Sequence, residues 1–144
     1  MGRQQGYGER VLVVDDERDF REITGQLLEE HGYRALTACD GIEALNLYRK
    51  HRGEIRVVIT DLIVPAMEGR VLIQTLHQIN PGVRVIAASG LSTHENLADT
   101  TSEVVRAFLP KPYEINRLLA TLNHVVNEAD TLSVPPSLCI CRRS

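Results

Sequence analysis

Five polar side chains stand where predicted strands end, and their types suit the chemistry of a phosphoryl group. They are the adjacent acids Asp15 and Asp16, a third acid at Asp61, the hydroxyl of Ser89 and the amine of Lys111. Three carboxylates that lie close together repel one another unless they are protonated or share a cation. A hard divalent ion such as Mg²⁺, or the similar Mn²⁺, suits a few carboxylates and leaves room for waters and phosphate oxygens.

The hydroxyl and the amine complete this pattern on the other side of the third acid. Ser89 and Lys111 would hold the remaining oxygens of a phosphoryl group through a hydroxyl donor and an ammonium. A carboxylate that attacks phosphorus in line becomes an aspartyl phosphate, while cationic groups neutralise the equatorial oxygens. The pattern therefore predicts that Asp61 accepts a phosphoryl group.

Five apolar runs, each followed by a helical pattern, must position these side chains. Connections of this length exclude hairpins and favour right-handed crossovers. We therefore expect an α/β domain, a doubly wound five-stranded parallel sheet of order 2-1-3-4-5 with helices on both faces. The predicted strands are 10–15, 33–38, 56–60, 83–88 and 104–109, and the predicted helices are a first one carrying Phe20, Ile23, Leu27 and Leu28 and ending at His31-Gly32, then 40–51, 68–79, 92–102 and one with an apolar stripe from Ile115 to Val126.

Ligands of such sheets bind beyond the carboxyl ends of the strands, where the strand order reverses. The first and third strands flank that point, so Asp15, Asp16 and Asp61 should meet there. The second strand ends at Ala38-Cys39 without a comparable group. This difference fits an edge position for the second strand.

Length and composition place the chain among single globular domains. It has 144 residues, a net charge of -3 and a pI near 5.9, which argue against a broad nucleic-acid surface. Its apolar runs are far shorter than a membrane span. We expect a flexible lead over 1–9, one domain over 10–128 and a disordered tail over 129–144.

The three cysteines favour a reducing compartment. Cys39 lies mid-chain, whereas Cys139 and Cys141 lie in the last six residues, so the three form no disulfide framework. The polar first ten residues lack the apolar core of a signal peptide. A cytoplasmic location is the expectation.

From about residue 9 to 128 the chain resembles the receiver domain of two-component response regulators, which has a CheY-like, flavodoxin-like fold. The resemblance implies a signalling domain rather than an enzyme, phosphorylated with the help of Mg²⁺. It rests on four segments, Val13-Val14-Asp15-Asp16-Glu17, Thr60-Asp61-Leu62-Ile63-Val64-Pro65-Ala66-Met67-Glu68-Gly69, Ala88-Ser89-Gly90 and Pro110-Lys111-Pro112.

The resemblance implies roles for the acids. Asp61 would be the phosphoacceptor, and Asp16 and the backbone carbonyl of Ile63 would be direct metal ligands. Asp15 would act mainly through metal-bound water.

It also implies a switch. Ser89 would move toward the phosphate and Lys111 would pair with it. Phe108 stands where the family has a mobile aromatic residue, although it lacks a hydroxyl and a plain core role is the more ordinary interpretation. Ile63 and Leu91 occupy positions that influence hydrolysis in the family, and their apolar side chains predict slow self-dephosphorylation.

The partners implied are a sensor histidine kinase or a phosphotransfer protein, and a downstream partner at the face of helix 4, strand 5 and helix 5. Neither nucleic acid nor membrane is expected to bind this domain. The preferred parent is a hybrid sensor histidine kinase, and the alternative is a stand-alone regulator. Two other classes remain open: a phosphohydrolase of the haloacid-dehalogenase type, which would need its nucleophile on the first strand, and a degenerate receiver that only docks.

Overall fold

The computed structural model describes residue 6 and residues 8–61, 63–64, 67–89, 104–110 and 114–127. Five parallel strands form one sheet in the order β2-β1-β3-β6-β7, which confirms the predicted order 2-1-3-4-5. The main elements are β1 (Arg10–Val14), α1 (Arg18–Glu30), β2 (Arg34–Ala38), α2 (Gly41–Lys50), β3 (Ile55–Asp61), α3 (Gly69–Ile79), β6 (Val85–Ser89), β7 (Val105–Pro110) and α5 (Ile115–Val126).

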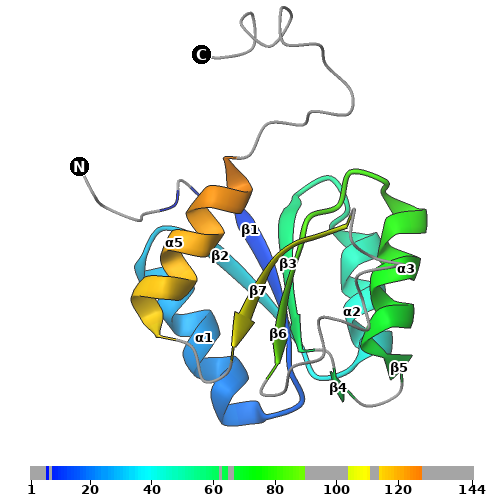
Figure 1. Cartoon of the computed structure of the whole chain (residues 1–144), viewed down its shortest axis with the longest axis horizontal. Coiled ribbons are helices and arrows are strands. Elements are labelled where there is room, and N and C mark those ends of the chain that lie inside the picture. Colours follow the sequence, from blue (N-terminus) through cyan, green and yellow to red (C-terminus); the bar gives the residue numbers. More distant parts are fainter. Residues whose placement is uncertain are drawn as a thin grey trace, which may run out of the picture.

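Helices cover both faces of the sheet, with α1 and α5 on one side and α2 and α3 on the other (Figure 1). Alternate residues of β1 supply the two cores. Val11 and Val13 pack into the cluster that includes Leu118 and Leu122 of α5, whereas Leu12 packs with residues of α2 and α3. Strands buried on both faces need continuous apolar runs, which is why the sequence predicts them so clearly.

Helix α1 ends at the predicted place, before the His31-Gly32 pair, and Gly32 closes it. Gly32 has a φ of 93°, and its N–H donates to the carbonyl of Glu29 at 3.3 Å. The N–H of Tyr33 donates to the carbonyl of Leu28 at 2.9 Å. These two bonds define a Schellman motif, in which a left-handed glycine closes the helix.

The buried face of α1 differs from the predicted stripe. Ile23 is 57% exposed, whereas Thr24 and Gly25 are buried. A methyl group on Gly25 would lie 3.4 Å from the side chain of Thr37 on β2. Leu28 is fully buried as the stripe predicts, so hydropathy located the inner face but missed the small residues Thr24 and Gly25 and wrongly included Ile23.

Helix α2 begins as predicted at Asp40. The Asp40 carboxylate accepts a hydrogen bond from the N–H of Glu43 at 2.7 Å, the usual N-cap arrangement. The apolar residues of this helix share one stripe, of which Leu45 and Tyr48 are buried and Ile42 is 53% exposed. Ile42 lies in the first turn, at the margin of the stripe.

A short antiparallel ribbon that the sequence did not predict follows β3. It pairs β4 (Ile63–Val64) with β5 (Met67–Glu68) and leads directly into α3. The predicted helix 92–102 and the predicted tail 129–144 lie outside the described residues.

The start of the chain, expected to be a flexible lead, contacts the turn between α1 and β2 where it is described. The N–H groups of Gly6 and Gly8 donate to the carbonyls of His31 and Gly32 at 2.7 and 2.6 Å. Gly6 is buried, and a methyl group there would lie 2.6 Å from ring carbons of Tyr33. The hydropathy pattern gave no sign of this close contact.

No helix in the described part of the chain is both long and apolar enough to cross a membrane.

Candidate phosphoryl-transfer site

The register of the strands brings the predicted site residues to one edge of the sheet. Val14 of β1 lies opposite Thr60 of β3, so Asp15 and Asp61 are the next residues on neighbouring strands. Asp61 in turn lies opposite Ala88 of β6, and Ser89 follows. This edge is formed by the carboxyl ends of parallel strands, where α/β proteins bind ligands.

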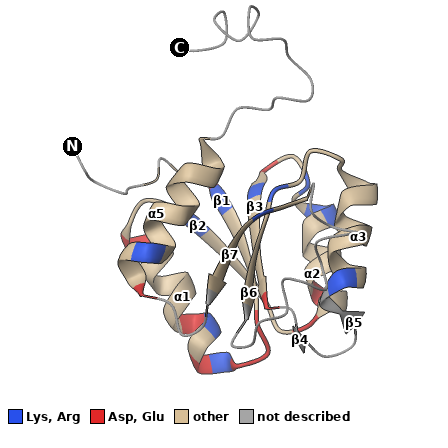
Figure 2. Cartoon of the chain, viewed as in Figure 1, with Lys and Arg blue, Asp and Glu red and all other residues tan. Residues whose placement is uncertain are grey.

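The three acids converge as the sequence predicts. Asp15, Asp16 and Asp61 each offer a carboxylate oxygen, and these oxygens all lie within 4.8 Å of one another. Asp15 is buried, Asp61 is half-buried and Asp16 is exposed. Figure 2 shows acidic segments at this end of the molecule, in the loop that joins β1 to α1. The cluster therefore opens to solvent on the side of Asp16.

Asp15 is fixed by hydrogen bonds at three of its polar groups. Its N–H donates to the carbonyl of Ala38 at 3.1 Å, and one carboxylate oxygen accepts the N–H of Glu17 at 2.9 Å. Its own carbonyl accepts a hydrogen bond from Nη1 of Arg21 at 2.9 Å. A carboxylate that is only 3% exposed needs such partners, because an unpaired buried charge is costly.

Sequence reasoning did not identify Arg21 and Thr60 as parts of this site. Arg21 lies at the end of the first turn of α1 and reaches back to the loop. Thr60 is fully buried, and its hydroxyl donates to the carbonyl of Asp61 at 2.9 Å. The spacing of Arg21 six residues after Asp15 was the available signal, but the helix start had to be known before that spacing had a meaning.

The other predicted site residues are described unequally. Ser89 is the last residue of β6 and lies opposite Pro110 of β7, so the chain continues from Pro110 toward Lys111 at the same edge. Lys111 itself and Leu91 lie outside the described residues. Ile63 is paired with Glu68 in the ribbon that follows Asp61.

Phe108 is 42% exposed on β7, so a plain core role is wrong. Strand β7 is the edge strand of the sheet next to β6. An exposed ring on an edge strand can rotate without emptying the core. The position is therefore compatible with a mobile aromatic residue.

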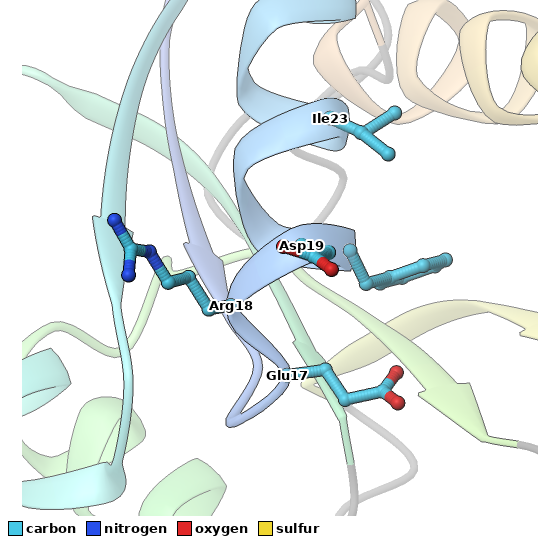
Figure 3. Close-up of a pocket in the computed structure, with 5 residues that line it drawn as sticks. Glu17, Arg18, Asp19 and Ile23 are labelled. Carbon is cyan, nitrogen blue, oxygen red and sulfur yellow. The ribbon is translucent and has the colours of Figure 1, made fainter.

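An open hollow lies along the first turns of α1, on residues that begin just after Asp16 in the sequence. It has a volume of about 410 Å³ and is lined by Glu17, Arg18, Asp19, Phe20 and Ile23. Figure 3 shows Ile23 and Asp19 on the same side of the helix, with Glu17 at its start. Apolar and charged side chains thus share this part of the surface of α1.

Cys39, at the end of β2, is not activated as a nucleophile. Its pKa is raised, first by the hydrogen bond with Glu43 and further by burial and by the negative charges of Glu43 and Asp40. The positive charge of Arg21 opposes this effect. A raised pKa keeps the thiol protonated at neutral pH, and the thiolate is the reactive form.

The donor set of the cluster fits a hard divalent cation. Three carboxylates gathered within 4.8 Å supply oxygen ligands and negative charge, which Mg²⁺ prefers over nitrogen or sulfur. An oxygen-rich site of this kind that is open on one side leaves room for a phosphoryl group. The arrangement can therefore support attack by a carboxylate on phosphorus.

Comparison with known proteins gives a consistent result. A family model described as the response regulator receiver domain matches residues 11–123. The sensor kinase CckA of Brucella abortus is 29% identical over 120 residues, which are 83% of this chain and 13% of that protein. A response regulator receiver protein of Anaeromyxobacter is 36% identical over 110 residues, which are 76% of this chain and 45% of that protein. The chain thus spans less than half the length of both relatives.

A solved structure adds a ligand to the comparison. The crystal structure of the CheX–CheY–BeF3–Mg²⁺ complex from Borrelia burgdorferi matches with a TM-score of 0.75 and 27% identity. The match covers 81% of this chain and 87% of that chain. That complex contains both a magnesium ion and BeF3.

Proposed function

The chain belongs to the response regulator receiver family, and from this premise we propose that Asp61 accepts a phosphoryl group from a phosphohistidine of a sensor kinase or phosphotransfer protein. The observation that carries the proposal is the convergence of three carboxylate oxygens within 4.8 Å at the carboxyl edge of the sheet. Asp61 is the one acid of the three that ends the middle strand, β3. It therefore has the acid pair on one side and Ser89 on the other.

The proposed transfer exchanges one bond to phosphorus for another. A carboxylate oxygen of Asp61 forms a bond to phosphorus, and the bond from phosphorus to the imidazole nitrogen of the donor breaks. The electron pair of the broken bond remains on that nitrogen, and the ring leaves as neutral imidazole when its other nitrogen carries a proton. Bound Mg²⁺ would neutralise charge on the phosphoryl oxygens, held by Asp15, Asp16, Asp61 and the carbonyl of Ile63.

Two further groups act on the product in this proposal. Lys111 would pair with the phosphate, and the hydroxyl of Ser89 would donate a hydrogen bond to it. The placement of Ser89 on the strand next to Asp61 supports its role. For Lys111 the support is the path of β7, which ends at Pro110 beside Ser89.

Signal output follows as a shift between two conformations. The new charge would draw Ser89 inward and change the packing of helix 4 and β7, so that a partner binds their face with α5 differently. Phe108, which is 42% exposed on β7, would form part of this face. Helix 4 lies outside the described residues.

The test is incubation with acetyl phosphate and Mg²⁺, followed by measurement of intact mass. The expected result is one added phosphoryl group per chain, lost in Asp61→Asn and lost when the metal is chelated. Glu17→Gln, which changes a neighbouring acid outside the trio, is the matched control and should still be modified. Equal modification of Asp61→Asn would refute the assignment.

The parent protein is a second part of the proposal. A hybrid sensor histidine kinase is favoured because the similar segment of CckA is 13% of that sensor kinase. A stand-alone regulator is the alternative, supported by the CheY chain of which the match covers 87%. Immunoblotting of cells that make the native protein decides between them, because a hybrid kinase would give a band several times larger than 16.1 kDa.

A further inference from the structure

Arg21 donates a hydrogen bond to the loop that carries Asp15 and Asp16, and no role above accounts for it. Its Nη1 donates to the carbonyl of Asp15 at 2.9 Å. Its own backbone N–H donates to the carbonyl of Glu17, also at 2.9 Å, within the first turn of α1. The side chain therefore ties the end of β1 to the helix that follows.

The carbonyl that Arg21 holds belongs to the peptide bond between the two adjacent acids. That peptide is planar, so a fixed direction for the carbonyl of Asp15 also fixes the N–H and Cα of Asp16. The other groups of Asp15 are bound elsewhere, its N–H by Ala38 and one carboxylate oxygen by the N–H of Glu17. Asp16 is exposed, so packing constrains it little. The hydrogen bond from Arg21 therefore helps to fix the backbone that leads from Asp15 into Asp16.

We propose that Arg21 is a positioning residue of the cation site, which orients the peptide between Asp15 and Asp16 so that both carboxylates meet Asp61. This inference rests on the proposed function, since it assumes that the acid trio binds Mg²⁺. The hydrogen bond is charge-assisted and partly buried, which makes it stronger than a neutral surface bond. Such supporting contacts change metal affinity by about 10-fold or more when they are removed.

The charge and the hydrogen bond of Arg21 have opposite effects on Mg²⁺ affinity, so the direction of the change in a variant shows which of them dominates. A guanidinium near the acids repels a divalent cation, so removal of the charge alone would tighten Mg²⁺ binding, mainly at low ionic strength. Loss of loop orientation weakens binding at every ionic strength. The positioning role therefore predicts weaker binding that salt does not restore.

The experiment is calorimetric titration of the full chain with MgCl2 at low and high ionic strength. Arg21→Met, which keeps the aliphatic stem but removes all donors, should raise the Kd about 10-fold at both. Arg21→Lys, which keeps a donor and the charge, should stay within about twofold of the wild type. If Arg21→Met does not fold, Arg21→Ala, which also lacks a donor and suits a helix, takes its place with the same expected loss.

Arg18→Met is the matched control. Arg18 carries the same charge in the first turn of α1, but it is 78% exposed and pairs with Glu22 at 3.0 Å. Its removal should leave the Kd within about twofold of the wild type. An equal loss in Arg18→Met would overturn the positioning role, because the effect would then arise without the hydrogen bond to the carbonyl of Asp15.

Two further readouts separate positioning from a general effect on the fold. The amide of Glu17, whose N–H is bound to Asp15, should exchange hydrogen faster in Arg21→Met than in the wild type. Phosphorylation by acetyl phosphate should need more Mg²⁺ for half-saturation yet reach the wild-type rate at saturation. Unchanged or tighter Mg²⁺ binding in Arg21→Met would overturn this inference alone. A wild-type chain that binds no Mg²⁺ would overturn the proposed function and this inference with it.

Discussion

Replacement of Asp15 by Asn should stabilise the magnesium-free domain. The side chain of Asp15 is only 3% exposed, and its carboxylate lies within 4.8 Å of those of Asp16 and Asp61. Two unit charges 4.8 Å apart repel by roughly 0.9 kcal/mol at the dielectric constant of water and by roughly 3.5 kcal/mol at an effective value of about 20. Asp15 is buried and Asp61 is half-buried, so the repulsion energy between them lies between these two values. Removal of the Asp15 charge should therefore raise the free energy of unfolding by about 2 kcal/mol.

The Asn variant keeps the local hydrogen bonding that the structure describes. Its amide oxygen can still accept the N–H of Glu17, and the backbone bonds to Ala38 and Arg21 do not involve the carboxylate. The new amide N–H2 can also donate to the neighbouring acids. The main change is therefore the loss of one buried negative charge.

Urea unfolding with and without MgCl2 measures the effect. Without the metal, Asp15→Asn should unfold at higher urea than the wild type, and its Tm should rise by on the order of 8 °C. With the metal, the wild type should gain stability according to its affinity, whereas the variant should gain less. The difference between the two proteins therefore narrows as Mg²⁺ is added.

Asp40→Asn is the control for this experiment. Asp40 makes an analogous bond, accepting the N–H of Glu43 at 2.7 Å, but it caps α2 outside the trio. Asn is as good an N-cap as Asp, so the change should be within about 0.5 kcal/mol. An Asp15→Asn variant less stable than the wild type without Mg²⁺, or a difference that Mg²⁺ does not narrow, would contradict the electrostatic reasoning.

Three further predictions concern the start of the chain, a buried tyrosine and the phosphorylated state. Gly6→Ala should lower the free energy of unfolding in urea by about 1–3 kcal/mol, because its methyl group would lie 2.6 Å from ring carbons of Tyr33. Gly53→Ala, where the added methyl group meets open space, should change it by less than about 0.5 kcal/mol. Equal effects of the two changes would contradict a packed position for Gly6. Burial raises the pKa of Tyr48 above its ordinary value of 10.0, so its contribution to stability is complete below pH 10.0 and is lost as the pH rises toward the folded-state pKa. Tyr48→Phe should therefore make the fall in Tm at alkaline pH less steep. An unchanged slope would contradict this role of Tyr48. Because the apolar side chains of Ile63 and Leu91 cannot orient a water by hydrogen bonding, the phosphoryl group should be lost with a half-life well beyond seconds. Intact mass followed over time measures this loss, and a half-life of seconds would refute the prediction.

The sequence was sufficient to predict the sheet and the meeting of the acids, because both depend on patterns that few folds share. Buried parallel strands need continuous apolar runs, and the acids follow two of these runs directly, at Asp15 and Asp61. Once the strand order was inferred, neighbouring strand ends placed the acids together without any side-chain information. The structure confirmed that meeting within 4.8 Å.

Contacts that depend on close approach were beyond sequence reasoning. The inner face of α1 uses Thr24 and Gly25 rather than Ile23, because small residues suit a tight helix–sheet contact that hydropathy does not report. Gly6 against Tyr33 is a tighter case, since a methyl group there would lie 2.6 Å from ring carbons of Tyr33, whereas one at Gly25 would lie at an ordinary contact distance of 3.4 Å from Thr37. Neither feature leaves a periodic signal.

The bond from Arg21 to the carbonyl of Asp15 was missed for a related reason. It joins a side chain to a backbone group, and which carbonyl is within reach depends on where α1 begins. A shift of one residue in that helix start would turn the guanidinium away. Hydrogen bonds from a side chain to a distant backbone group can be identified only from coordinates, whereas the three acids could be identified from the sequence.

Identification of the residue that carries the phosphoryl group tests the central claim most directly. The chain is treated with acetyl phosphate and Mg²⁺, reduced with borohydride and digested, and the peptide that contains Asp61 is sequenced by mass spectrometry. Borohydride reduces an aspartyl phosphate to homoserine, so the account predicts homoserine at position 61. Homoserine at position 15 or 16, a phosphate ester on Ser89, or no Mg²⁺-dependent product at all would contradict it.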